Sequence, residues 1–178
     1  MSKILVDTID TRSGTTTLTL GSSNAGTIAL GSGDVQSNFL QPSFFVKLSS
    51  SQSISSGSFT KITFDSEEWD TDSAFASNKF TVPSGKAGKY FFTAGIYIDG
   101  LDDGEYNELF FYKNGSSINW GRQNSNSPRT DAHGAFTTNA ILNLNASDYI
   151  EIYVYQNEGA ARNADANYTF FAGHRIGT

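Results

Sequence analysis

Hydrophobic and polar residues alternate along much of the chain, most clearly between residues 88 and 99. In an extended strand, one face of this stretch carries Tyr90, Phe92, Ala94, Ile96 and Ile98, and the intervening residues fall on the other face. Pro83 and Gly85 come just before it and interrupt any hydrogen-bonded ladder, so residues 80–82 are expected to form a separate short strand. The pattern predicts a short strand, a glycine-rich turn and a long half-buried strand.

The same alternation recurs through the rest of residues 42–178. Further strands are expected around residues 44–48, 59–65, 109–113, 118–120, 136–144, 149–155 and 168–172. Asn114-Gly115 is a strong signal for a two-residue hairpin. Polar segments at 65–72, 121–134 and 157–167 are expected to be connections. Roughly ten strands without amphipathic helices between them predict an all-β, antiparallel two-sheet sandwich, a jelly roll or a Greek-key relative.

Residues 1–41 differ from the remainder because they contain almost no aromatic side chains. Thr17-Leu18-Thr19-Leu20-Gly21-Ser22 recurs ten residues later as Thr27-Ile28-Ala29-Leu30-Gly31-Ser32. Such a unit cannot bury its apolar face alone, and three intertwined chains would supply the missing sheets. A low-complexity leader is the alternative. Pro42 marks a boundary, so we expect a short-strand stalk or attachment segment at 1–41 and a sandwich domain, the head, at 42–178.

Composition narrows the classes of partner. The chain has no cysteine, which excludes disulfides and thiolate chemistry, and its formal net charge is -6, which disfavours nucleic acid and anionic membrane surfaces. No apolar run approaches the roughly 18 to 20 residues that span a bilayer, so membrane insertion is not expected. Stability is therefore expected to come from packing or from oligomerisation.

Several motifs of the head, in order, resemble the C1q/TNF-like globular domain. Gly88-Lys89-Tyr90-Phe91-Phe92 is similar to the family's central signature, Tyr112-Lys113-Asn114-Gly115 to its hairpin, and Thr169-Phe170-Phe171-Ala172-Gly173 to its closing motif. Phe64, Asp70, Phe75 and Phe80 stand at related spacings, and residues 142–150 resemble a further family segment. The resemblance covers residues 43–178 and implies a ten-stranded jelly roll that assembles as a homotrimer.

The strands themselves also favour self-association. Residues 109–112 and 149–155 carry bulky aromatic or aliphatic side chains on both faces, and a solitary sandwich buries only one face of each sheet. The collagen-like Gly-X-Y stalk of the animal proteins is absent. The N-terminal repeat instead looks like those of short structural proteins of bacteriophages, in which a C1q-like head tips a fibre or decorates a virion.

One acidic loop is a candidate ion site. Asp99, Asp102, Asp103 and Glu105 supply carboxylate oxygens of the kind that Ca²⁺ accepts from one loop, although their spacing is not that of an EF-hand. A solvated acidic turn is the alternative, and a glycosidase-like carboxylate pair is a third interpretation. We expect no other cofactor.

Two polar loops are candidates for recognition. Their candidate binding residues, with hydrogen-bonding groups and an aromatic face suited to sugars, are Trp120, Arg122, Arg129, Asp131, His133, Arg162 and Asp165. Solvated connections are the alternative, although binding is usually grafted onto loops in such scaffolds. His133 and His174 are the only histidines and have no nucleophile elbow beside them, so no catalytic residue is expected.

Three functions follow from these observations. The first is a trimeric phage appendage, such as a tail fibre, that attaches to other virion proteins through residues 1–41 and presents the head to a host-surface glycan. The second is a capsid decoration protein, and the third is a carbohydrate-degrading appendage enzyme. The first two are not enzymes, and all three place the protein in the virion.

Overall fold

The head is an antiparallel β-sandwich. The computed structural model describes residues 42–126 and 132–177, and within them all regular structure is β-strand. No helix in these ranges is long and apolar enough to cross a bilayer. The strands are β1 (Ser43–Lys47), β2 (Gln52–Ile54), β3 (Thr60–Lys61), β4 (Ser66–Asp70), β5 (Phe75–Ala76), β6 (Lys79–Thr81), β7 (Gly88–Leu101), β8 (Tyr106–Lys113), β9 (Ser116–Asn126), β10 (Ala132–Leu144), β11 (Tyr149–Gln156), β12 (Arg162–Ala164) and β13 (Phe170–Gly177).

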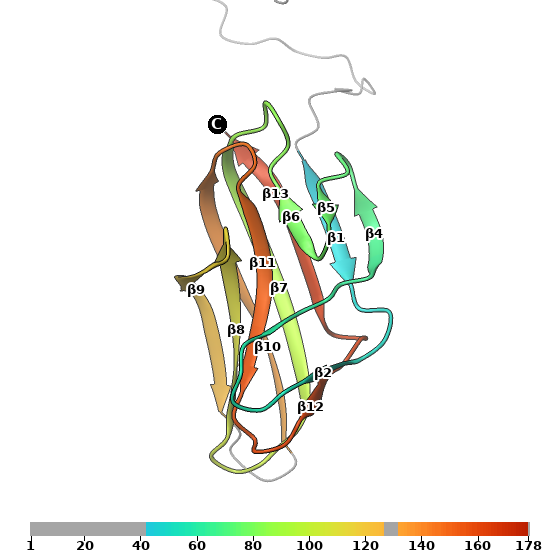
Figure 1. Cartoon of the computed structure of the whole chain (residues 1–178), viewed down its shortest axis with the longest axis vertical. Coiled ribbons are helices and arrows are strands. Elements are labelled where there is room, and N and C mark those ends of the chain that lie inside the picture. The colour runs from blue at the N-terminus through green and yellow to red at the C-terminus, as the bar shows by residue number, and fades with distance from the viewer. Residues whose placement is uncertain (1–41, 127–131, 178) are drawn as a thin grey trace, which may run out of the picture. The chain divides into compact units, whose positions relative to one another are not determined.

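The strands form two sheets. The seven-stranded sheet has the order β2-β12-β7-β13-β1-β4, and β10 pairs with β7; the six-stranded sheet has the order β5-β6-β11-β8-β9, and β3 pairs with β11. All pairings are antiparallel. Because Ser43 pairs with His174, the start of β1 and the end of β13 lie at one end of the head (Figure 1). The β7–β8 and β11–β12 connections lie at the opposite end, called the tip below.

The core forms where the inner faces of the sheets meet. Tyr90, Phe92, Ala94, Ile96 and Ile98 of β7 are all buried, which confirms the predicted alternation. They meet inward residues of the six-stranded sheet, among them Leu109, Phe111, Ile150, Ile152 and Val154. The Tyr90 hydroxyl donates to the Lys86 carbonyl at 2.6 Å, and burial raises its pKa to about 12.

The predicted two-residue hairpin between β8 and β9 is confirmed. Asn114 and Gly115 have φ values of 51° and 79°, the left-handed region that a type I′ turn requires. The Asn114 side chain accepts from the Tyr149 amide at 2.9 Å and donates to Asp148 Oδ1 at 2.8 Å. The hairpin is thereby tied to the turn between β10 and β11.

The polar connections are shorter than the sequence predicted. Of the segment 121–134, β9 takes residues up to Asn126 and β10 begins at Ala132, so the predicted loop is wrong over most of its length. The short strands β4 and β12 lie inside the segments 65–72 and 157–167. Backbone pairing with a neighbouring strand overrides weak local β-propensity, which also explains why the described ranges hold more than ten strands. The predicted stalk at residues 1–41 and its boundary lie outside the described residues.

Candidate functional site

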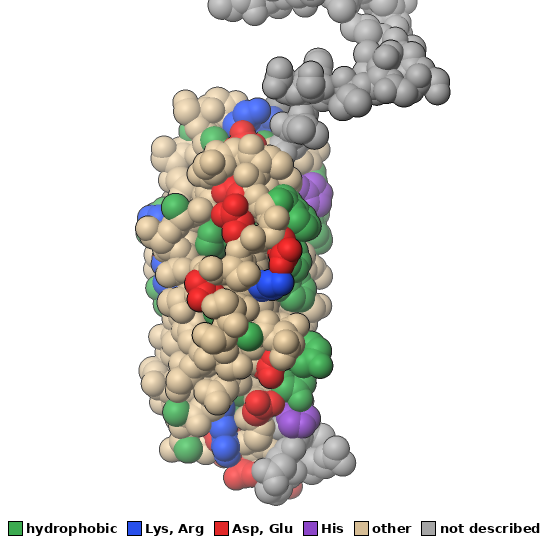
Figure 2. All heavy atoms as spheres, turned by 90° about the vertical axis from the view of Figure 1, so that its right-hand side faces the viewer, with side chains coloured by type: hydrophobic (Ala, Val, Ile, Leu, Met, Phe, Trp, Pro, Cys, Tyr) green, Lys and Arg blue, Asp and Glu red, His purple; other side chains and the backbone are tan. Residues whose placement is uncertain are grey.

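One side of the seven-stranded sheet carries an unusual amount of exposed apolar surface. The outward positions include Phe45, Trp69, Phe91, Tyr97, Ile141, Phe170, His174 and Ile176, with Tyr168 just before β13; we call this set the seven-strand face. Trp69, Ile141, Tyr168 and Ile176 are 51%, 61%, 60% and 47% exposed. Figure 2 shows hydrophobic side chains gathered along one side of the view, between the two histidines.

A row of aromatic rings crosses four strands of this face. Trp69 of β4 stacks on Phe45 of β1 with ring centroids 5.3 Å apart, and Phe45 stacks on Phe170 of β13 at 5.7 Å. Phe170 in turn covers Gly95 of β7, because a Cβ added at Gly95 would lie 2.3 Å from its ring. The glycine therefore gives the ring room to lie close to the sheet.

A second aromatic group lies toward the tip of the same face. Tyr97 packs against Tyr168 with ring centroids 5.0 Å apart and stacks on His133 at 5.1 Å. His133 Nδ1 lies 3.5 Å from Asp99 Oδ1. Burial, followed by the nearby charge of Asp99, raises the pKa of Tyr97. At the other end of the face His174 contacts Phe91, with ring centroids 5.6 Å apart.

The part of the seven-strand face formed by β7, β10 and β13 carries no formal charge between Lys89 and Asp99. The nearest charge is Lys47 of β1, which lies opposite Phe170 and pairs with Glu68. Between Lys89 and Asp99, the outward positions of β7 are Phe91, Thr93, Gly95 and Tyr97. Neighbouring outward positions are Ala172 on β13 and Thr137, Asn139 and Ile141 on β10. Depletion of charge around exposed aromatic side chains is the composition found at the centre of protein interfaces, so this face is suited to contact another protein surface.

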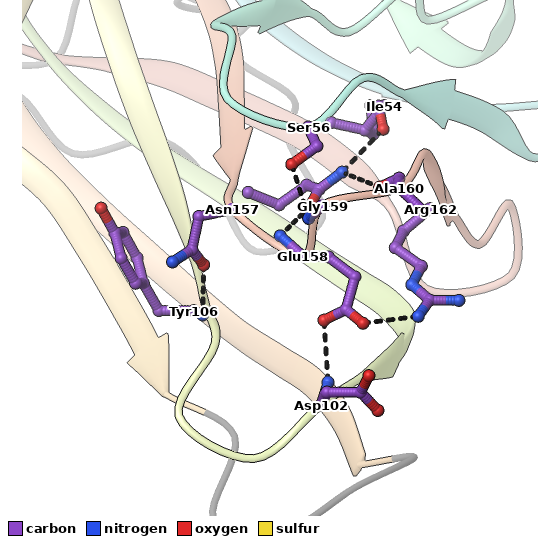
Figure 3. A network of polar contacts seen from close by, with 10 residues as sticks. Ile54, Ser56, Asp102, Tyr106, Asn157, Glu158, Gly159, Ala160 and Arg162 are labelled. Carbon is purple, nitrogen blue, oxygen red and sulfur yellow. Dashed lines mark hydrogen bonds and ion pairs between the residues drawn. The ribbon is translucent and has the colours of Figure 1, made fainter.

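At the tip, a carboxylate that the sequence analysis missed holds two connections together (Figure 3). Glu158 Oε2 accepts from the Asp102 amide at 2.8 Å, and its Oε1 pairs with Arg162 Nη2 at 2.5 Å. The Glu158 side chain is only 1% exposed. Burial raises its pKa, but the hydrogen bonds from Arg162 and from the Asp102 amide outweigh burial, and the net shift is downward. The one sequence signal was the four-residue spacing from Glu158 to Arg162.

Amide side chains reinforce the same connection. Gln156 Nε2 donates to the carbonyls of Ile54 and Ala160 at 3.0 and 2.8 Å, and its Oε1 accepts from the Glu158 amide at 2.7 Å. Asn157 Oδ1 accepts from the Tyr106 amide at 2.7 Å (Figure 3). The residues around Arg162 therefore hold the β11–β12 loop in one conformation.

The four candidate ion ligands are not drawn together. Asp99 faces His133, Asp102 uses its amide for Glu158, and Asp103 is exposed. Glu105 Oε2 is buried without a hydrogen-bond partner. Over residues 42–126 and 132–177, no three His, Cys, Asp or Glu side chains form a group that could hold a metal. The Ca²⁺ site stays a prediction.

The candidate recognition residues separate into several environments. His133 lies on the seven-strand face, Arg162 pairs with Glu158, and Asp165 caps a turn by accepting from the Asn167 amide at 2.7 Å. Trp120 lies in strand β9, as predicted, and Arg122 also lies in β9 rather than in a loop; the side chains of both lie outside the described set. Arg129 and Asp131 lie outside the described residues. The structure thus unites His133 with Asp99, which the sequence assigned to different sites.

The fold can now be compared with known proteins. The sequence matches no protein-family model and no curated protein. The globular domain of zebrafish complement 1qA has a TM-score of 0.56 at 17% identity, covering 76% of this chain and 97% of that domain. The fold is C1q/TNF-like. Eiger TNF from S. frugiperda has a TM-score of 0.55 at 14% identity, and the match covers 77% of this chain and 92% of that chain. Murine APRIL has a TM-score of 0.56 at 12% identity, and the match covers 76% of this chain and 99% of that chain.

Proposed function

We propose that this protein is a homotrimeric bacteriophage appendage, such as a tail fibre, that presents its C1q/TNF-like head to the host surface. Residues 1–41 attach it to other virion proteins. The observation that carries the proposal is the seven-strand face, where exposed aromatic side chains surround a centre without formal charge. A monomer leaves this surface in water, whereas an assembly buries it.

Burial of the seven-strand face supplies the driving force for assembly. Full burial of one large apolar side chain stabilises by roughly 1.5 to 3 kcal/mol, and Trp69, Ile141 and Tyr168 are each more than half exposed. Three copies related by a three-fold axis form a closed assembly in which each copy makes the same contacts. The resemblance of the head to C1q/TNF-like domains supports three copies rather than two.

The N-terminal repeat supports the virion location. Two short apolar units ten residues apart, at 17–22 and 27–32, need partner chains to cover them, and they resemble repeats of phage structural proteins. Three heads on one stalk present three copies of any host-binding site, and effective concentration then strengthens weak individual contacts. The proposal assigns binding rather than catalysis to the head.

Three measurements test this proposal. Sedimentation velocity of the full chain at micromolar concentration should give a trimer, and a monomer would contradict the assembly. Gold labelling of phage particles should place the protein on the tail, and purified trimers should bind host cells. Labelling on the capsid without host-cell binding would instead establish the decoration function.

A separate assay tests the carbohydrate-degrading alternative. Purified protein is incubated with host polysaccharide and the reducing ends are measured. We expect none to be released. Release that is lost in Asp102→Asn or Glu105→Gln would establish the appendage as an enzyme.

A further inference from the structure

The outward side of the six-stranded sheet is also aromatic. Its rings come from β8, β11 and the residue before β3. We call this set the six-strand face, and its members are Phe59, Tyr106, Phe110, Tyr112, Tyr149, Tyr153 and Tyr155. Tyr149 also contacts Lys79 of β6. Phe59 is 53% exposed, and the five tyrosines are half-buried. The face lies on the opposite side of the sandwich from the seven-strand face. In the proposed trimer, Phe59 and the half-buried tyrosines of this face therefore stay open to the surroundings, whereas Phe110 is already buried within the chain at 5% exposure.

Its rings form one continuous series. Tyr112 stacks on Tyr153 with centroids 4.1 Å apart, and Phe110 meets Tyr112 edge-on at 6.4 Å. Phe59 contacts both Phe110 and Tyr155 at 5.2 Å, and Tyr155 contacts Tyr106 at 5.8 Å. From Tyr106 to Tyr112 the β8 strand extends roughly 20 Å. The series is long enough for an extended chain molecule to contact several rings.

Charged groups also lie among these rings. Glu151 lies opposite Tyr112 and pairs with Lys61, Nζ to Oε1, at 2.6 Å, and Lys79 Nζ lies 4.2 Å from the centre of the Tyr149 ring. Glu108 lies opposite Tyr155 and is also buried, at 6% exposure. Charged residues are depleted from the centres of protein interfaces. The six-strand face is therefore less suited than the seven-strand face to pack against a second copy.

The chemistry of the face selects a neutral, hydroxyl-rich ligand. The hydroxyls of Tyr112 and Tyr153 are protonated at neutral pH, as tyrosine hydroxyls ordinarily are, and can donate as well as accept hydrogen bonds. Aromatic rings beside hydroxyls suit a molecule with both apolar and polar edges, which describes a pyranose ring. The net charge of -6 opposes acidic polysaccharides.

We propose that the six-strand face is the host-binding site and that its ligand is a neutral polysaccharide chain lying along the Tyr106–Tyr112 series. This inference rests on the proposed function, because it names the receptor class and the surface that contacts it. It differs from the sequence expectation, which placed sugar binding in the loops. The polysaccharide contacts Phe59 and Tyr155 at the middle of the ring series and Tyr112 at one end of it.

The test uses the full-length protein and an array of neutral and acidic bacterial polysaccharides, followed by titration with a neutral oligosaccharide from the strongest hit. We expect binding to neutral polysaccharides. Phe59→Ala and Tyr112→Ala should each weaken oligosaccharide binding roughly tenfold, as expected for the loss of one ring contact. Ser84→Ala, in the exposed turn before β7 and outside both faces, is the control and should leave the oligosaccharide affinity unchanged.

Assembly is measured in parallel, so that failure of the inference is distinct from failure of the proposed function. If an intact trimer binds only acidic polysaccharides, or none, the inference is overturned. The proposed trimeric assembly is not affected by that result. Neutral binding that neither Phe59→Ala nor Tyr112→Ala weakens overturns the site. If Phe59→Ala instead dissociates the trimer, a second copy covers this face and the assignment is wrong.

Discussion

The two outward faces of the sandwich are both aromatic, yet they differ in where charge is placed. On β7, β10 and β13 the seven-strand face has no formal charge between Lys89 and Asp99, and the nearest charges are the ion pair of Lys47 on β1 and Glu68 on β4. The six-strand face has carboxylates directly opposite its rings, at Glu108 and Glu151. Counting hydrophobic residues would treat the two surfaces as equivalent. The distribution of charge separates a surface suited to bury against a copy of the chain from one suited to remain in water.

Placing a lysine on each face in turn tests this difference with the largest expected effect. Ile141→Lys puts an ammonium into the seven-strand face, where no acidic partner lies on the neighbouring outward positions of β7. We expect the trimer to weaken roughly a hundredfold or more, since an unpaired buried charge costs about 3 kcal/mol or more. Sedimentation velocity across a concentration series measures the effect. Phe59→Lys is the matched control, and its dissociation to monomers would show that both faces are interfaces.

Removing the Glu158 carboxylate should loosen the tip where the chain crosses between the sheets. Glu158→Ala leaves the Asp102 amide without its acceptor and removes the partner of Arg162 at 2.5 Å. We expect a loss of about 2 to 4 kcal/mol in unfolding free energy, because both contacts are charge-assisted and nearly buried. Urea denaturation measures it. Asp103→Ala, exposed in the same tip, should change stability by less than about 0.5 kcal/mol; equal losses would contradict the role of Glu158.

Adding one methyl group at Gly95 tests the aromatic row by itself. Gly95→Ala places a Cβ 2.3 Å from the Phe170 ring, and the ring must move away from the sheet. We expect a loss of about 1 to 3 kcal/mol from this overpacking, together with weaker assembly, measured by thermal unfolding and sedimentation. Gly177→Ala is the control in β13, because its Cβ would meet nothing within 4 Å. An unchanged trimer in Gly95→Ala would show that the Phe170 position is not needed for assembly.

Acid should destabilise the turn between β10 and β11, which lies at the end of the sandwich opposite the tip. Hydrogen bonds from Lys113 and then Asn114 lower the pKa of Asp148 from 3.8 to about 2. Because the folded-state pKa is depressed, the stabilisation is present above pH 4 and is lost as the pH falls from 4 toward 2. Allowing for solvent screening, we expect the ionised Asp148 carboxylate to contribute about 1 to 2 kcal/mol to the free energy of unfolding. Urea denaturation at pH 5 and pH 2.5 should show a smaller pH-dependent loss in Asp148→Asn than in the wild type.

The fold was more accessible from the sequence than the site. Alternation in residues 90–98 and the Asn114-Gly115 turn are local signals, so the long strand and the hairpin were predicted correctly. Segment 121–134 was misassigned because its first residues, up to 126, pair with β8 and its last residues, from 132, pair with β7, and neither partner is visible in the local pattern. The contacts of Glu158 with Asp102, and of His133 with Asp99, join residues 56 and 34 positions apart. Such pairs follow from topology and strand register, which no local pattern contains.

The antiparallel pairing of Ser43 with His174 makes this head suitable as a scaffold for displaying a foreign peptide. A tag fused after residue 177 would emerge beside the strand that enters the domain. A foreign peptide inserted between Asp103 and Gly104 would instead be carried at the opposite end. Gly104 has a φ of 87° and open space around it, so an epitope placed there would point away from the fusion end without disturbing either sheet.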